Sequence, residues 1–222
     1  MSSEDAEDLL HDSVIELFDL SDYSSTLPND AKERYVAKLN EVQCDCPYVI
    51  ENEYWTSSTQ ELETILPSVE FGDVWNYLVY RKQFYTGNDM NNYKSCKSYE
   101  IIFGDGLFFE FKALKLTNNN FLAKAKVHHS MAFSLPPLRP WVAFNPAGGV
   151  ITAHCDCIAG LGECCSHVGA IIFGALVVNA QKTTLTVTDQ PMKWLRKSVK
   201  PVTYSYLYCV NTVTNFIVSL NS

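Results

Sequence analysis

The spacing of hydrophobic residues divides the chain into a helical part and a strand-rich part. Up to about residue 80, apolar residues recur every three or four positions, which predicts helices. One helix is expected over 31–40, after an N-cap at Asn29 or Asp30, and another over 73–80. The first helix should turn Tyr35, Val36 and Leu39 inward and Lys32, Glu33 and Lys38 outward.

From Tyr99 onward the period approaches two, which predicts strands. These are the runs YEIIF, LFFEFKALKL and FLAKAKVHH, followed by a hairpin over 141–144 and 150–153. In FLAKAKVHH the alternation puts Lys124 and Lys126 on the same face of the sheet. The apolar run VGAIIFGALVVNA predicts a buried helix, because its 13 residues fall short of the roughly 20 that span a bilayer. We therefore expect an α+β fold with a short antiparallel sheet and no membrane partner.

Composition narrows the class of protein. The chain has 222 residues, of which 47% are hydrophobic, so it can bury a core as one ordinary domain or two small ones. This content is too high for a disordered chain. The N-terminus MSSEDAEDLL lacks the basic and apolar segments of a secretory signal, so we expect a nuclear or cytoplasmic protein with reduced cysteines.

Four of the eight cysteines fall within eleven residues, in the segment HCDCIAGLGECCSHVGAII. Reduced cysteines clustered in this way indicate a metal site, and zinc is the ion that prefers four sulfur or nitrogen ligands. Cys155 and Cys157 form one chelating pair at a strand end. Cys165 and His167 form a second pair at the start of the following helix, although Cys164 would also pair with His167 as C-x-x-H.

The pattern C-x-C, seven residues, C-x-H closely resembles the SWIM-type zinc finger. The resemblance implies a two-stranded hairpin packed on one helix. It also implies that the ligands of Zn²⁺ are Cys155, Cys157, Cys165 and His167, which leaves Cys164 as a neighbouring free thiol. Such a set fills all four positions around the metal, so we expect a structural site and not a catalytic one.

A wider resemblance covers roughly residues 32–194. Segments such as ERYVAKLN, LPSVEFGDVWNYLVY and FYTGNDMNNYKSCKSYE look like a group of invertebrate SWIM-finger proteins, in which a YqaJ-type exonuclease domain typically follows the finger. Two cysteines usual in that group are absent from 187–194, and the last twenty residues do not resemble it. We expect an acidic disordered tail over 1–28, an N-terminal α+β region over 29–123, the finger module over 124–180 and a divergent extension over 181–222.

Charge is distributed unevenly and suggests where a partner binds. Residues 1–70 carry 17 acidic and 3 basic side chains, whereas the remaining residues carry 8 and 14. DNA is one candidate partner, and its phosphates would meet basic residues near the finger, which are Lys124, Lys126, His129, Lys193, Arg196, Lys197 and Lys200. A protein partner is the alternative, docked on the acidic N-terminal segment or on the apolar helix.

Two further hypotheses concern other chemistry. Asp105, Glu110 and Lys112 form a D-x4-E-x-K string, as in nucleases that hold Mg²⁺ with two carboxylates, but any charged strand produces such a string often. We therefore expect a protein that is not an enzyme. Cys44 and Cys46 form a second C-x-C without a nearby C-x-H, so we expect no second metal site there.

Overall fold

The computed structural model describes residues 19–80, 107–129, 134–158 and 163–184. The described helices before the sheet are α2 (Asp22–Ser25), α3 (Asn29–Val42), the short 3₁₀ helix η1 (Asn52–Tyr54), α4 (Thr59–Ile65), α5 (Phe71–Trp75) and the π-helical turn η2 (Asn76–Tyr80). The strands are β1 (Phe108–Lys115), β2 (Phe121–Val127), β3 (Trp141–Phe144) and β4 (Val150–His154), and α7 (Ser166–Thr184) follows them. The predicted strand YEIIF lies outside the described residues.

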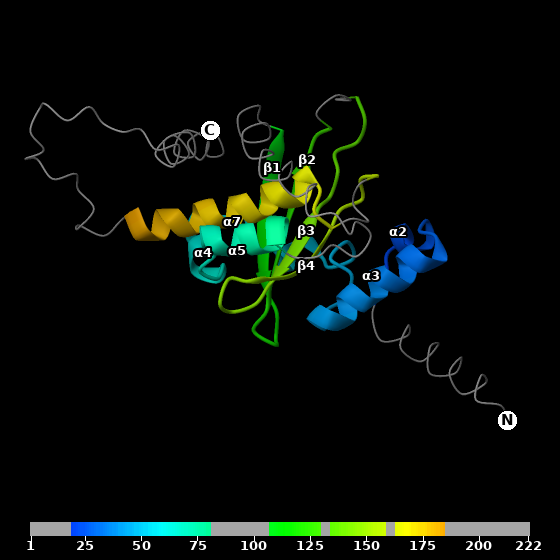
Figure 1. Ribbon diagram of the computed structural model, residues 1–222, viewed down its shortest axis with the longest axis horizontal. Coiled ribbons are helices and arrows are strands. Elements are labelled where there is room, and N and C mark those ends of the chain that lie inside the picture. The colour runs from blue at the N-terminus through cyan, green and yellow to red at the C-terminus, as the bar shows by residue number, and fades with distance from the viewer. Residues whose placement is uncertain (1–18, 81–106, 130–133, 159–162, 185–222) are drawn as a thin grey trace, which may run out of the picture.

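The four strands form one antiparallel sheet in the order of the chain, β1-β2-β3-β4. Helix α7 packs on one face of the sheet together with α4 and α5, and α3 lies on the other side (Figure 1). The α+β class, the hairpin of β3 and β4 and the buried helix after the cysteines are therefore confirmed. No helix in the described part of the chain is both long enough and apolar enough to span a membrane.

Alternation along β2 builds a separate hydrophobic core on each face of the sheet. Phe121, Ala123, Ala125 and Val127 contact the core beneath α7. Leu122 points to the opposite core, where Trp141 of β3 is fully buried against α3. Because both faces are covered, β3 is buried at every position, although a sheet of this kind often leaves one face to solvent.

Helix α3 confirms the predicted inward face but corrects its outward one. Tyr35, Val36 and Leu39 are buried as expected. Lys38 is only 1% exposed, although the periodicity predicts it on the solvent side. The helix begins at Asn29 after Pro28, without a side-chain cap. Lys38 is buried because Glu163 and strand β4 cover it, a contact that helical periodicity does not encode.

Two expected boundaries differ from the observed packing. Residues 19–28 lie within the packed part of the chain, since α2 is ordered and Leu20, Tyr23 and Leu27 contact the second core. The expected tail therefore reaches no further than residue 18, and residues 1–18 lie outside the described range. Strand β2 crosses the boundary expected between residues 123 and 124, so the two predicted regions share one sheet and its cores.

The turn between β3 and β4 depends on a glycine. Gly148 has a φ of 94°, and a Cβ at this position would collide with the carbonyl oxygen of Ser68. We expect Gly148→Ala to lower the free energy of unfolding by about 1–3 kcal/mol, measured by urea denaturation. Gly72→Ala is the matched control, since a Cβ there meets nothing within 4 Å. Equal stability of the two variants would contradict the close approach.

Candidate metal centre

Four side chains converge between the end of the sheet and the start of α7. Cys155, Cys157, Cys165 and His167 each offer one donor atom, and these atoms all lie within 4.8 Å of one another. Cys155 and Cys165 are buried, whereas Cys157 and His167 are half-buried. The structure thus brings together the four residues that the C-x-C and C-x-H spacing singled out, and this group could hold a metal ion.

Two regular elements position the two pairs. Strand β4 ends at His154, so Cys155 and Cys157 follow directly after a strand that is paired with β3. Helix α7 starts at Ser166, which places Cys165 just before its first turn and His167 within it. The backbone N–H of Val168 points at the Cys165 Sγ at 3.5 Å. Free N–H groups at a helix start favour a thiolate there, which is the form of cysteine that binds metal.

The three sulfurs influence one another's protonation. Burial raises the pKa of Cys155 well above its usual range. Hydrogen bonds from Cys155, and then from Cys165, lower the pKa of Cys157 instead. A divalent cation would favour the thiolate at all three positions, so its binding would release protons.

The donor set fits zinc. Three thiolates and one imidazole are ligands that zinc accepts in tetrahedral sites, and four of them leave no position for a water molecule. Thiolate donors suit Mg²⁺ and Ca²⁺ poorly, because those ions prefer oxygen. The group can therefore serve as a closed, structural metal centre.

A buried ion cluster formed with α3 holds Glu163, which lies just before the second candidate pair. The Glu163 carboxylate accepts two hydrogen bonds from Arg34, at 2.7 and 3.0 Å, and lies 3.1 Å from the Lys38 ammonium. Tyr77 donates its hydroxyl to the Glu163 carbonyl oxygen. Glu163 precedes the candidate ligands Cys165 and His167 by two and four residues, so this cluster anchors the backbone next to the second candidate pair.

The same lysine also contacts the end of β4, next to the first candidate pair. Lys38 donates to the carbonyl oxygen of Ala153 at 3.0 Å, and its ammonium lies 3.3 Å from the His154 Nδ1. The other ring nitrogen of His154 lies 3.0 Å from the Tyr23 hydroxyl. Burial, followed by the charge of Lys38, lowers the pKa of His154 well below its usual value. His154 is therefore held neutral beside Cys155 and is not one of the four converging donors.

Sequence patterns did not identify Arg34, Lys38 and Glu163 as part of this site. Arg34 and Lys38 are four residues apart on α3, which is the spacing that places two side chains on one helix face. That spacing is common on exposed helices, so it does not single out a buried pair. Glu163 precedes Cys165 and His167 of the C-x-H pair, and this position is the only sequence signal that could have drawn attention to it.

The remaining candidates lie elsewhere. Cys164 is half-buried beside the core and does not belong to the converging group. Cys44 and Cys46 are buried in the second core, where the Cys46 sulfur lies 3.1 Å from the Tyr35 hydroxyl. The Glu110 carboxylate pairs with Lys126 at 2.8 Å. Asp105 lies outside the described residues, as do Lys193, Arg196, Lys197 and Lys200.

Comparisons with models of protein families, with curated proteins and with solved structures gave no match.

Proposed function

We propose that this protein binds one Zn²⁺ through Cys155, Cys157, Cys165 and His167, and that the ion has a structural role. The observation that carries the proposal is the convergence of four donor atoms of the right chemistry within 4.8 Å. The resemblance of the segment to the SWIM-type zinc finger supports the same ligand set. Together they favour zinc over the oxygen-seeking divalent ions.

In this role the ion joins the end of β4 to the start of α7. Without it, Cys155 and Cys165 would be buried thiols that only weak sulfur hydrogen bonds satisfy. With it, the loop between the ligand pairs is closed at both ends, and α7 is fixed over the sheet. The proposed metal therefore stabilises the module and takes no part in a reaction.

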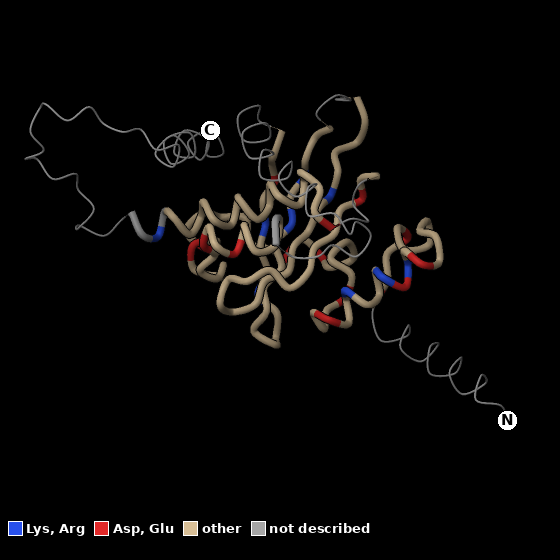
Figure 2. Tube along the Cα trace, in the orientation of Figure 1, with Lys and Arg blue, Asp and Glu red and all other residues tan. Residues whose placement is uncertain are grey.

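We further propose that this protein binds nucleic acid through the sheet that carries β1 and β2. Lysines gather on β1 and β2, whereas α4 carries acidic residues (Figure 2). This separation of charge would direct a polyanion to the sheet and away from α4. A role in protein interaction alone is the competing proposal, and it becomes the better one if neither single- nor double-stranded DNA binds at low salt.

Native mass spectrometry of the purified chain tests the metal. We expect one zinc ion per chain, and we expect Cys155→Ser, Cys165→Ser and His167→Gln to lose it. Cys164→Ser is the matched control, because its sulfur is adjacent in sequence but is not in the ligand group, and it should keep the zinc. A folded chain that carries no metal, or a loss of zinc in Cys164→Ser alone, would contradict the proposed ligand set.

A further inference from the structure

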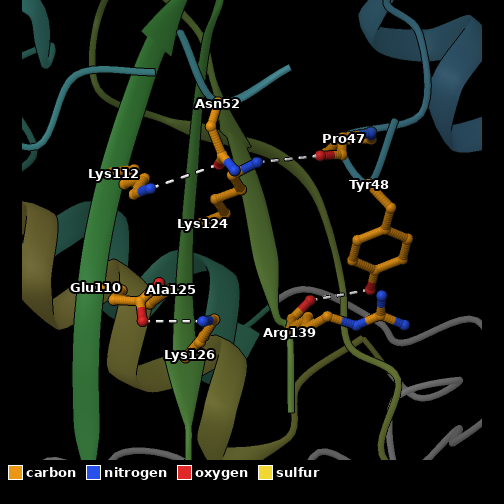
Figure 3. A pocket seen from close by; sticks show the side chains of 9 residues that line it. All are labelled: Pro47, Tyr48, Asn52, Glu110, Lys112, Lys124, Ala125, Lys126 and Arg139. Atoms are coloured by element: carbon orange, nitrogen blue, oxygen red, sulfur yellow. Dashed lines mark hydrogen bonds and ion pairs between the residues drawn. The ribbon is translucent and has the colours of Figure 1, made fainter. Parts of the chain in front are cut away.

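A small pocket opens on the face of the sheet opposite α7, and its lining is rich in cations. It encloses about 160 Å³ between β1, β2, the segment around Tyr48 and the start of β3. Four of its lining residues are basic, namely Lys112, Lys124, Lys126 and Arg139, and one is acidic, Glu110 (Figure 3). The pocket therefore carries a net positive charge in a chain whose total charge is −8.

The lysines face one another across two strands. Lys112 of β1 is the register partner of Lys124 on β2, so two like charges are directly opposite. Such a pair destabilises a sheet unless something of opposite charge lies between its members. Among the described residues, no carboxylate forms an ion pair with either lysine; Lys112 donates to the Asn52 side chain and Lys124 to the Pro47 carbonyl oxygen, each at 3.4 Å.

A β-bulge creates this arrangement. Between Phe109 and Lys112 the register of β1 against β2 shifts by one residue, and Glu110 there has a φ of 51°. The extra residue turns Phe111 into the core and Lys112 onto the pocket face. Without the bulge, Lys112 would point into the apolar core beneath α7. Bulges that redirect a side chain in this way are common next to functional sites.

Two cations are held in place by aromatic rings. The Lys124 ammonium lies 3.8 Å from the centroid of the Trp55 ring, and the Arg139 guanidinium lies 4.6 Å from that of Tyr48. Arg139 also pairs with Asp156, at 3.0 Å. Because Asp156 lies between the ligands Cys155 and Cys157, the wall of the pocket is tied to the proposed metal centre.

We propose that this pocket binds the phosphates of a nucleic-acid strand, an inference that rests on the proposed nucleic-acid partner. Lys124 and Lys126 are two residues apart on one strand, or roughly 7 Å. This distance is similar to that between successive phosphates of a nucleic-acid backbone, so a row of cations along β2 suits a polymer of phosphates. The exposed pair of Lys126 with Glu110 is a weak competitor, since exposed ion pairs contribute little.

Fluorescence anisotropy with short labelled single- and double-stranded DNA tests the proposal. Lys112→Gln and Lys126→Gln should each weaken DNA binding relative to the unmodified protein, since each removes one phosphate contact. We expect this loss of affinity to be roughly five- to eightfold larger at about 0.1 M salt than at about 1 M salt. The slope of log K against log salt should fall by about 0.7–0.9 for each substitution. Lys115→Gln is the matched control, because it removes the same charge from an exposed position of β1 outside the pocket.

The outcomes separate this inference from the proposed function. Binding that weakens equally in Lys112→Gln, Lys126→Gln and Lys115→Gln overturns the pocket but keeps the nucleic-acid partner. Absence of DNA binding by the folded, zinc-loaded chain overturns both the pocket and the proposed nucleic-acid partner. Calorimetric titration with inorganic phosphate distinguishes the source: a pocket that binds free phosphate but no oligonucleotide is not a nucleic-acid site. Zinc content and circular dichroism of each variant exclude a loss of fold.

The pH dependence of binding gives a second measurement. Burial, followed by the charge of Lys112, lowers the pKa of Lys124 to about 8. The other charged or titratable groups near it are Cys46, on the segment after α3, and the pocket residues Tyr48, Glu110, Lys126 and Arg139. DNA affinity should fall by up to about fivefold between pH 8 and 9, because a neutral Lys124 must first take up a proton. Lys124→Arg should bind independently of pH in this range, and an equal fall in this variant would argue against a role for Lys124.

Discussion

Removal of the proposed zinc is expected to unfold the described domain. Structural zinc sites in small peptides bind with about 10–16 kcal/mol, which matches or exceeds the 5–15 kcal/mol that separates a typical folded domain from its unfolded state. Treatment with a strong chelator, or the substitution Cys155→Ser, should therefore abolish the cooperative thermal transition and reduce the helical circular dichroism signal. Helix α7 should contribute most to this loss, because its apolar surface is stable as a helix only when packed on the sheet.

Two controls make this result specific to the metal. Adding Zn²⁺ back to the chelated protein should restore the transition, whereas Mg²⁺ should not, since Mg²⁺ binds thiolates poorly. Cys164→Ser should melt close to the unmodified protein. If chelation removes the metal and leaves the dichroism spectrum and thermal midpoint unchanged, the ion is not structural.

The second large effect is expected at Glu163. Glutamine has nearly the same shape, so Glu163→Gln leaves the backbone and the packing in place and removes only the charge. The Lys38 ammonium, whose side chain is 2% exposed, would then be buried without an anion. Breaking a buried pair in this way costs about 3–5 kcal/mol. We expect a loss of this size in the free energy of unfolding, measured in urea at neutral pH with zinc present.

Comparison with an exposed ion pair gives the control for Glu163. Lys126→Gln breaks the pair with Glu110, in which both side chains are more than 40% exposed, and should cost no more than about 1 kcal/mol. Combining Glu163→Gln with Lys38→Met should cost less than the sum of the two single substitutions, because the second removes the unpaired charge. A loss below about 1 kcal/mol for Glu163→Gln would mean that the buried pair with Lys38 does not stabilise the fold.

The sequence predicted the candidate metal centre well because its ligands are local. Cys155 and Cys157 are two residues apart, as are Cys165 and His167, and the change from a strand period to an apolar helix places each pair at the end of an element. Patterns that span so few residues can be recognised from the amino-acid sequence alone. The same is true of β2, where the alternation correctly placed Lys124 and Lys126 on one face.

Contacts between distant segments were not visible in this way. Lys38 and Glu163 are 125 positions apart in the chain, and only the packing of α3 against β4 and the metal loop brings them together. The helical period placed Lys38 in solvent because it describes one helix alone and not what covers it. Ordering at 19–28 was missed for the same reason, since α2 becomes packed only through the second core.

By itself, then, the sequence determined the α+β class, the hairpin before the cysteines and the four candidate ligands, because all of these depend on residues close together in the chain. Only the tertiary structure decided that a buried ion cluster anchors Glu163 beside the candidate ligands, and that a bulge at Glu110 turns Lys112 toward Lys124. These features depend on the register between strands and on burial by distant elements, which are set by packing.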